Sequence, residues 1–198
     1  MAKQTGIFVD LSSLYYCVTK KYGRRKVSYK NLLEYVKGLG GEVKTAIAYG
    51  TQNNNEAEIF IKRIKELGFA TKYKAPRAVG GKNWYRGNWT TGMIADMMAE
   101  IPNLDRYVIC SSEFGLIDLC EYLMSQKKEV VILACDIADE LKKKIPSCVE
   151  IPESMLEGIR EKQPIVPGQP EALRTVLPPI IPDPKVQPKV EGQPELKI

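Results

Sequence analysis

The chain contains no histidine. This absence excludes catalytic triads built on histidine, zinc or haem sites ligated by histidine, and acid–base catalysis by an imidazole. Hydrolytic chemistry would have to use carboxylates with metal ions, a cysteine without an imidazole partner, or a serine–lysine pair.

Closely spaced cysteine pairs are also missing. The five cysteines are odd in number and form no C-x-x-C pair, which is typical of reduced thiols, so we expect a cytoplasmic location. Long apolar runs are missing, because the longest strongly apolar run, 130–135, is far shorter than the roughly 20 residues of a membrane span. The start of the chain lacks the apolar segment of a secretory signal. We therefore expect no membrane association.

The 198 residues are 44% hydrophobic and 27% charged, as in an ordinary globular protein with its own core. Nine of the thirteen prolines fall between Pro164 and Pro194, and prolines at this density prevent helices and inner strands. We predict one domain over 1–160 and an extended proline-rich tail over 161–198. The tail is either a spacer without a partner or a docking segment for a protein partner, which its Ile, Val and Leu residues favour.

Apolar segments typical of strands alternate along the domain with helical patterns. The strands are expected at 6–10, 42–49, 69–74, 106–110, 129–134 and 148–151. The helices are expected from Ser12 or Ser13 to 22, and over 28–38, 55–67, 88–100, 113–126 and 136–144, with a short one from 153. This alternation predicts a three-layer, Rossmann-like α/β fold with a mostly parallel sheet and helices on both faces. In such sheets ligands bind at the carboxyl ends of the strands.

Three acidic residues are expected at that edge. Asp10 ends the first strand, Glu113 follows the strand that ends at Cys110, and Asp96 lies on the helix after a basic loop. Carboxylates gathered in one place repel each other unless a divalent cation joins them. Asp10, Asp96 and Glu113 are therefore candidate catalytic residues and ligands of magnesium or manganese. Alternatively, Asp10 caps the first helix, Glu113 favours a helix amino terminus, and Asp96 faces solvent.

The basic loop predicts a nucleic-acid partner. Between Thr71 and Trp89 there are five positive side chains and no acidic one, with aromatic residues among them. Cations neutralise phosphates and aromatic faces stack on unpaired bases, so this composition favours single-stranded nucleic acid over a merely solvated surface. The candidate binding residues are Lys72, Lys74, Arg77, Lys82, Trp84, Tyr85 and Arg86.

Several segments carry a resemblance to a known family. Gly6-Ile-Phe-Val-Asp-Leu-Ser-Ser-Leu-Tyr resembles the opening of NYN domains of the LabA-like, DUF88 group, within the PIN-like nuclease superfamily. The similarity continues in order, to about residue 157. It runs through Ala48-Tyr-Gly-Thr-Gln-Asn-Asn-Asn-Glu-Ala-Glu, Gly87-Asn-Trp-Thr-Thr-Gly-Met-Ile-Ala-Asp-Met-Met, Cys110-Ser-Ser-Glu-Phe-Gly-Leu, Cys135-Asp-Ile-Ala-Asp-Glu-Leu and Glu150-Ile-Pro-Glu-Ser-Met-Leu.

The resemblance implies a Rossmann-like sheet with an acidic, divalent-metal centre that cleaves RNA. Under it, Asp10 and Glu113 would be metal ligands and Asp96 would order a metal-bound water. Polar groups around them would be Ser13 and Thr90, with Asp118 in reserve one helical turn beyond Glu113.

The chain departs from the family pattern at four positions. Thr90 and Gly115 stand where aspartates are expected, Glu113 replaces a shorter aspartate, and Ser13 replaces the usual asparagine. Two interpretations follow: a ribonuclease with a weakened acidic centre, or a nuclease-shaped RNA-binding or scaffold protein tethered through its tail. A third is an assembly subunit whose basic face meets an acidic protein.

Overall fold

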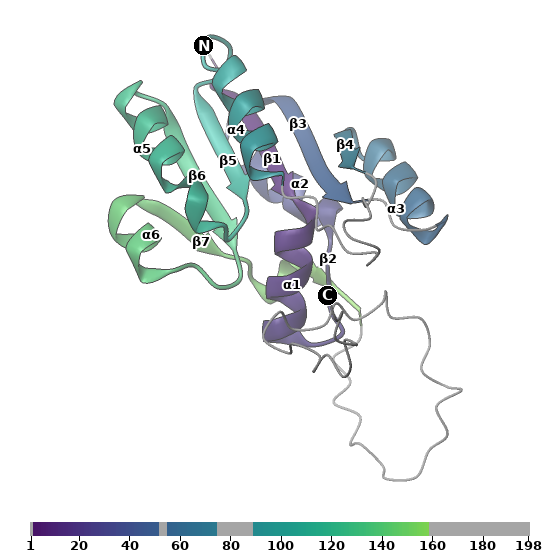
Figure 1. Cartoon of the computed structure of the whole chain (residues 1–198). Coiled ribbons are helices and arrows are strands. Elements are labelled where there is room, and N and C mark those ends of the chain that lie inside the picture. Colours follow the sequence, from purple (N-terminus) through teal and green to yellow (C-terminus); the bar gives the residue numbers. More distant parts are fainter. Residues whose placement is uncertain (1, 52–54, 75–88, 159–198) are drawn as a thin grey trace, which may run out of the picture. The chain divides into compact units, whose positions relative to one another are not determined.

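A computed structural model describes residues 2–51, 55–74 and 89–158, and Figure 1 shows its central sheet. The six strands are β1 (Gln4–Asp10), β3 (Glu42–Thr51), β4 (Ala70–Lys74), β5 (Arg106–Cys110), β6 (Glu129–Ala134) and β7 (Ser147–Glu150). Their spatial order is β4-β3-β1-β5-β6-β7, and every neighbouring pair is parallel. The predicted α/β fold with a parallel sheet is confirmed.

The order of the strands fixes where a ligand site can form. Numbered along the chain, the six strands lie in the order 3-2-1-4-5-6, so the chain winds outward from β1 in both directions. The winding reverses between β1 and β5, and in doubly wound sheets the crevice at this switch point, outside the carboxyl ends of the strands, is where ligands bind. Asp10 lies at that end of β1.

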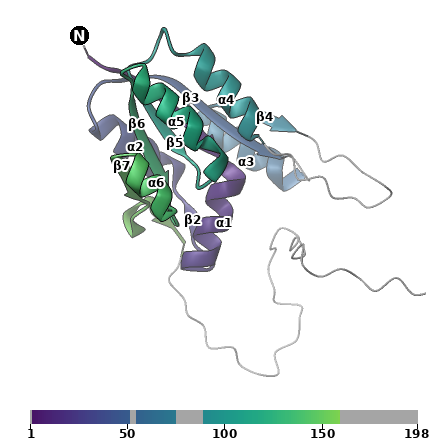
Figure 2. The ribbon, with the colours of Figure 1, turned by 60° about the vertical axis from the view of Figure 1, so that its left-hand side comes forward.

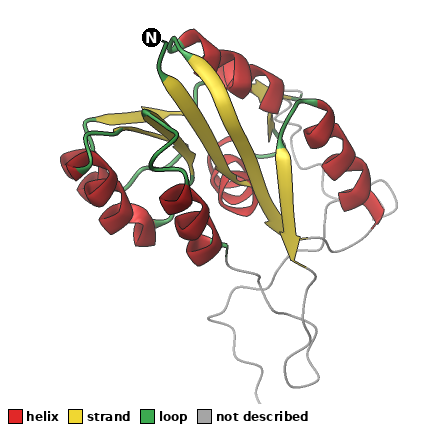
Figure 3. Cartoon of the chain, turned by 90° about the horizontal axis from the view of Figure 1, so that it is seen from above, coloured by secondary structure: helices red, strands yellow, loops and turns green. Residues whose placement is uncertain are grey.

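One face of the sheet is covered by α1 (Leu11–Tyr22), α2 (Tyr29–Gly38) and α3 (Asn55–Glu66). Side chains alternate along a strand, so Ile7 and Val9 of β1 point to this face. They pack with Leu14 of α1 and Leu32 of α2 in one buried cluster. Figure 3 shows helices on both sides of the sheet.

The opposite face is covered by α4 (Thr90–Ala99), α5 (Ile117–Ser125) and α6 (Asp139–Lys144). Phe8, between Ile7 and Val9, points to this side and packs with Tyr49, Met93 and Met97. Figure 2 shows α4 and α5 over this same face. The apolar run 130–135 is apolar throughout because β6 is an inner strand buried from both sides.

The structure differs from the sequence prediction mainly at element ends. The helix expected over 113–126 begins with a 3₁₀ turn, Phe114–Leu116, before α5, and the helix expected from 136 begins at Asp139. An unpredicted two-stranded antiparallel ladder joins β2 (Lys26–Val27) to β8 (Leu156–Glu157), after a 3₁₀ turn at Glu153–Met155. Strands of two residues carry too little sequence for a pattern to reveal them.

No helix in the described ranges combines the length and the apolar character needed to cross a membrane. The predicted tail, 161–198, lies outside the described residues, and its boundary stays a prediction.

Candidate functional site

The candidate site lies at the carboxyl edge of the sheet, where β1, β3, β4 and β5 end. Asp10, Tyr49 and Lys72 form one row across this edge, because Asp10 pairs with Tyr49 on β3 and Tyr49 pairs with Lys72 on β4. Ser111, Ser112 and Glu113 follow β5 on the other side of β1.

Asp10 caps the first helix. Its carboxylate accepts a hydrogen bond from the Ser13 backbone N–H at 3.0 Å, and its own backbone is extended, as an N-cap requires. A negative charge here also interacts favourably with the positive end of the helix dipole. The structure thus assigns the cap to Asp10 and not to Ser12 or Ser13, where the helix was predicted to begin.

Ser13 connects the two strands that flank the switch point. Its hydroxyl lies 3.0 Å from the Ser112 hydroxyl and accepts a hydrogen bond from the Ser112 backbone N–H, also at 3.0 Å. The start of α1 is thereby tied to the segment after β5. In the position where the family has asparagine, this serine links the ends of two strands.

Asp96 is paired with a lysine of the same chain. The Lys72 ammonium donates to both carboxylate oxygens, at 2.7 and 2.8 Å, and the Tyr49 hydroxyl donates to Oδ2 at 2.7 Å. The Asp96 side chain is 23% exposed. Burial raises the pKa of Tyr49, and the hydrogen bond and negative charge of Asp96 raise it further, so the tyrosine remains a donor. In the structure Asp96 is therefore paired and partly buried, and it does not simply face solvent as the alternative interpretation predicted.

Trp89, just before α4, closes this part of the site. The indole Nε1 donates to the Gly50 carbonyl at 2.7 Å, the ring lies 5.5 Å from the Tyr49 ring, and the Lys74 ammonium lies 4.1 Å over it. A Cβ on Gly92 would come within 2.8 Å of the indole, so the ring can fold back on its own helix only over a glycine. The sequence signal for this arrangement is the spacing Trp-x-x-Gly, which the sequence analysis did not use.

Glu113 lies beside the two positions where acids were expected, Thr90 and Gly115. Glu113 is exposed. It directly precedes the 3₁₀ turn, but its side chain makes no capping hydrogen bond to that turn. A Cβ built on Gly115 would lie 3.8 Å from Thr90 Cγ2 and 3.9 Å from Glu113 Oε1, so these two side chains flank Gly115. Asp118 is exposed in the first turn of α5, where its charge favours the helix amino terminus.

The three candidate ligands do not gather as one group in the described residues. Within the described ranges no three or more carboxylates and thiols are placed to hold one ion. The predicted convergence of Asp10, Asp96 and Glu113 on one cation is therefore not found. The physical reason is that Lys72 already neutralises Asp96, while Asp10 caps a helix and Glu113 extends toward Gly115. The catalytic and metal-binding roles of the three residues stay predictions.

The predicted nucleic-acid surface is only partly within the described residues. Lys72 and Lys74 lie on the edge strand β4, where they contact Asp96 and Trp89 respectively. The other candidate residues lie outside the described ranges: Arg77, Lys82, Trp84, Tyr85 and Arg86.

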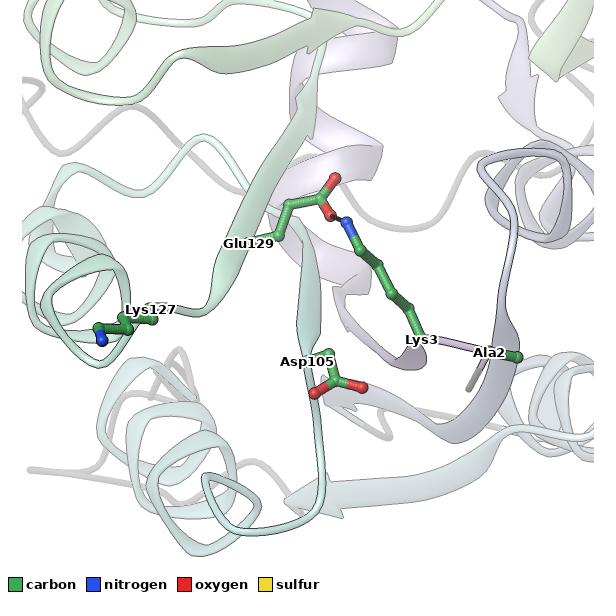
Figure 4. Close-up of a pocket in the computed structure, with 5 residues that line it drawn as sticks. All are labelled: Ala2, Lys3, Asp105, Lys127 and Glu129. Atoms are coloured by element: carbon green, nitrogen blue, oxygen red, sulfur yellow. Dashed lines mark hydrogen bonds and ion pairs between the residues drawn. The ribbon is translucent and has the colours of Figure 1, made fainter.

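A pocket of about 460 Å³ lies at the opposite edge of the sheet, where the strands begin (Figure 4). Two of its charged residues are paired: Lys3 Nζ lies 2.8 Å from Glu129, and the nearby Arg106 lies 3.0 Å from the same carboxylate. Burial disfavours the Glu129 carboxylate, but these two cations outweigh it, so the pKa of Glu129 is lowered. The pocket lies at the end of the sheet away from the switch point, and its ion pairs have a structural role. We therefore do not place the functional site there.

The strand order and the polar residues at the switch point define a doubly wound α/β protein of the Rossmann type. The NYN domain family matches residues 4–151, about three quarters of the chain, so the chain belongs to this family, within the PIN-like nuclease superfamily. No curated protein matches the chain.

The fold has a counterpart among solved structures. The chain is similar to a protein of unknown function from Vibrio parahaemolyticus, with a TM-score of 0.70 and 22% identity. The likeness covers 78% of this chain and 96% of that chain. At this identity it supports the fold alone.

Proposed function

We propose that this protein is an RNA-binding member of the NYN family that has lost metal-dependent cleavage. The observation that carries the proposal is the contact of Lys72 with both oxygens of Asp96, together with the hydrogen bond from Tyr49 to Oδ2. An acid that the family pattern keeps is thereby neutralised from within the chain.

The charge at the site supports this proposal. Two of the acids that the family pattern expects are replaced by Thr90 and Gly115, which supply no charge. Of the three candidate ligands, Asp96 is paired with Lys72 and Asp10 caps α1. Mg²⁺ gives up its water reluctantly and demands near-octahedral placement of its ligands, so this donor set is too poor to hold it in a fixed geometry.

Nucleic-acid binding does not depend on those acids. The chain has a net charge of +5, and the five positive and five negative residues of 161–198 cancel, so the excess belongs to the domain. Phe114, directly after Glu113, is 50% exposed at the same edge. An exposed aromatic face can stack on an unpaired base, and Lys72 and Lys74 lie at the same edge of the sheet on β4, separated from β5 by β3 and β1. The tail would then serve to tether the bound RNA to a protein partner.

Fluorescence anisotropy with a labelled single-stranded RNA tests the proposal. We expect the same affinity in EDTA and in manganese, and an affinity that falls as salt rises. Phe114→Ala should weaken binding about 5- to 150-fold, because one stacked base contributes roughly 1–3 kcal/mol. Tyr122→Ala is the matched control, since Tyr122 is also an exposed aromatic, 44% exposed, but lies on α5. Absence of binding, or binding only with metal, would refute the proposal.

A second candidate, a slow metal-dependent ribonuclease, is favoured by one observation. Asp10 and Glu113 lie at the ends of the two strands that border the switch point. Cleavage of labelled RNA in manganese that disappears in Asp10→Asn would establish it. A Cβ at position 115 would make only ordinary van der Waals contacts. The double variant Thr90→Asp/Gly115→Asp can therefore carry the two expected acids without a clash of that Cβ. We predict cleavage in that double variant and none in the natural protein.

A further inference from the structure

Two cysteines that are distant in the sequence meet on the α1 side of the sheet. Cys17 lies in the middle of α1, and Cys135 directly follows β6. Both belong to the same buried cluster, and both line a pocket of about 240 Å³. Their exposed fractions are 6% and 1%, so the sulfurs lie at the base of this pocket.

The rim of the pocket is charged and open to solvent. Lys20 and Asp136 form an ion pair at 3.0 Å, with side chains 79% and 65% exposed. Lys21 donates to the Cys135 carbonyl at 3.1 Å and pairs with Glu150. The rim side chains are largely exposed, so a small polar molecule can approach the pocket past them.

The two thiols differ in acidity because they interact. The Cys17 thiol donates a hydrogen bond to the Leu14 carbonyl at 3.3 Å. Its interaction with the Cys135 thiol lowers the pKa of Cys17 to about 7, while that interaction and burial raise the pKa of Cys135. By contrast, burial raises the pKa of Cys120 to about 12 and that of Cys110 still higher. A lowered pKa raises the fraction of Cys17 that is the nucleophilic thiolate at neutral pH.

We propose that Cys17 and Cys135 form a dithiol site that peroxide oxidises to an intramolecular disulfide joining α1 to the end of β6. The site is independent of the proposed RNA binding. Both thiols belong to one buried cluster and line the same pocket, which brings together the two side chains that the disulfide would join.

The oxidation proceeds in two steps. The Cys17 thiolate attacks one oxygen of hydrogen peroxide, the O–O bond breaks, and the departing hydroxide takes a proton to become water, leaving a sulfenic acid on Cys17. The Cys135 sulfur then attacks the Cys17 sulfur, the S–O bond breaks, and a second water leaves with the Cys135 proton. In total the two thiols lose two electrons and two protons, and one peroxide is reduced to two waters.

The test is a peroxide titration of the full chain, quenched with an alkylating reagent and followed by mass spectrometry of the intact protein and its peptides. We expect a loss of two hydrogen masses and one cross-linked peptide pair, containing Cys17 and Cys135. Before oxidation, Cys17 should be alkylated at least about tenfold faster than Cys120.

Variants separate the steps. Cys135→Ser should accumulate a sulfenic acid at Cys17 that dimedone traps, and Cys17→Ser should form no disulfide. Cys120→Ser is the matched control and should cross-link like the natural protein. Circular dichroism confirms that each variant is folded. A folded natural protein that forms no Cys17–Cys135 disulfide, or that cross-links other cysteines instead, would overturn the proposal.

Discussion

Replacing Lys72 by methionine tests whether the Lys72–Asp96 pair is an integral part of the fold. The substitution removes the ammonium group that lies 2.7 and 2.8 Å from the two Asp96 oxygens and keeps most of the aliphatic stem. The lysine side chain is 44% exposed, so solvent screening limits the ion pair to roughly 1 kcal/mol or less. The lysine makes two charge-assisted contacts and the carboxylate is only 23% exposed, so the contribution of this ion pair to stability should lie at the upper end of that range.

We therefore expect Lys72→Met to lower the free energy of unfolding by about 1 kcal/mol. For a domain of this size this corresponds to a fall of about 2–4 °C in the melting temperature. Urea unfolding followed by circular dichroism measures the change. Lys44→Met is the matched control, because Lys44 is also an exposed strand lysine and forms no ion pair with the described residues.

A double-mutant cycle with Asp96→Asn separates the pair from other effects of the substitutions. If the two side chains interact as the structure has them, the double variant is less destabilised than the sum of the single variants by about 1 kcal/mol. Additive losses would mean that the pair contributes nothing to the fold and would refute the reasoning.

Three further predictions concern other parts of the domain. Ser13→Ala should lower the free energy of unfolding by about 1–3 kcal/mol, because the partly buried Ser112 N–H loses its acceptor. Gly92→Ala should be destabilising and should change the emission spectrum of Trp89, because the 2.8 Å clash with the rigid indole outweighs the roughly 1 kcal/mol gain in helix propensity. Glu129→Gln should destabilise the protein at pH 7 but not in acid. The lowered pKa of Glu129 means that its stabilisation is present above the ordinary carboxyl range and is lost as pH falls through the folded-state value.

Each of these three predictions has a matched control. Ser12→Ala changes a neighbouring serine that makes no side-chain hydrogen bond within the described part of the chain, and should have little effect. Gly38→Ala should stabilise by about 0.4–1 kcal/mol, because a Cβ there meets nothing within 4 Å. Glu34→Gln removes an exposed ion pair on α2 and should leave the pH dependence unchanged. Equal effects of a variant and its control would contradict the corresponding prediction.

Most of the fold could be predicted from local sequence. Strands such as 129–134 can be recognised as continuous apolar runs. Ser28 was predicted as an N-cap, and in the structure its side chain accepts a hydrogen bond from the Asn31 backbone N–H. The short ladder between β2 and β8 could not be predicted, since two residues in each strand define no periodicity.

The candidate site was less predictable, because its contacts depend on strand register. Asp96 meets Lys72 only because β4 lies next to β3 in a register that pairs Lys72 with Tyr49, beneath α4. Sequence placed Lys72 in a nucleic-acid surface and Asp96 in a metal site, and nothing local indicated that they neutralise each other. Asp10 was predicted both as a ligand and as a helix cap, and the structure has the cap.

A manganese titration followed by the electron paramagnetic resonance signal of the free ion tests the account most directly. If Asp96 is neutralised by Lys72 and the remaining carboxylates do not converge, the free-ion signal of the natural protein should rise as it does in buffer throughout the micromolar range. A stoichiometric manganese site that disappears in Asp10→Asn and in Glu113→Gln would contradict the account.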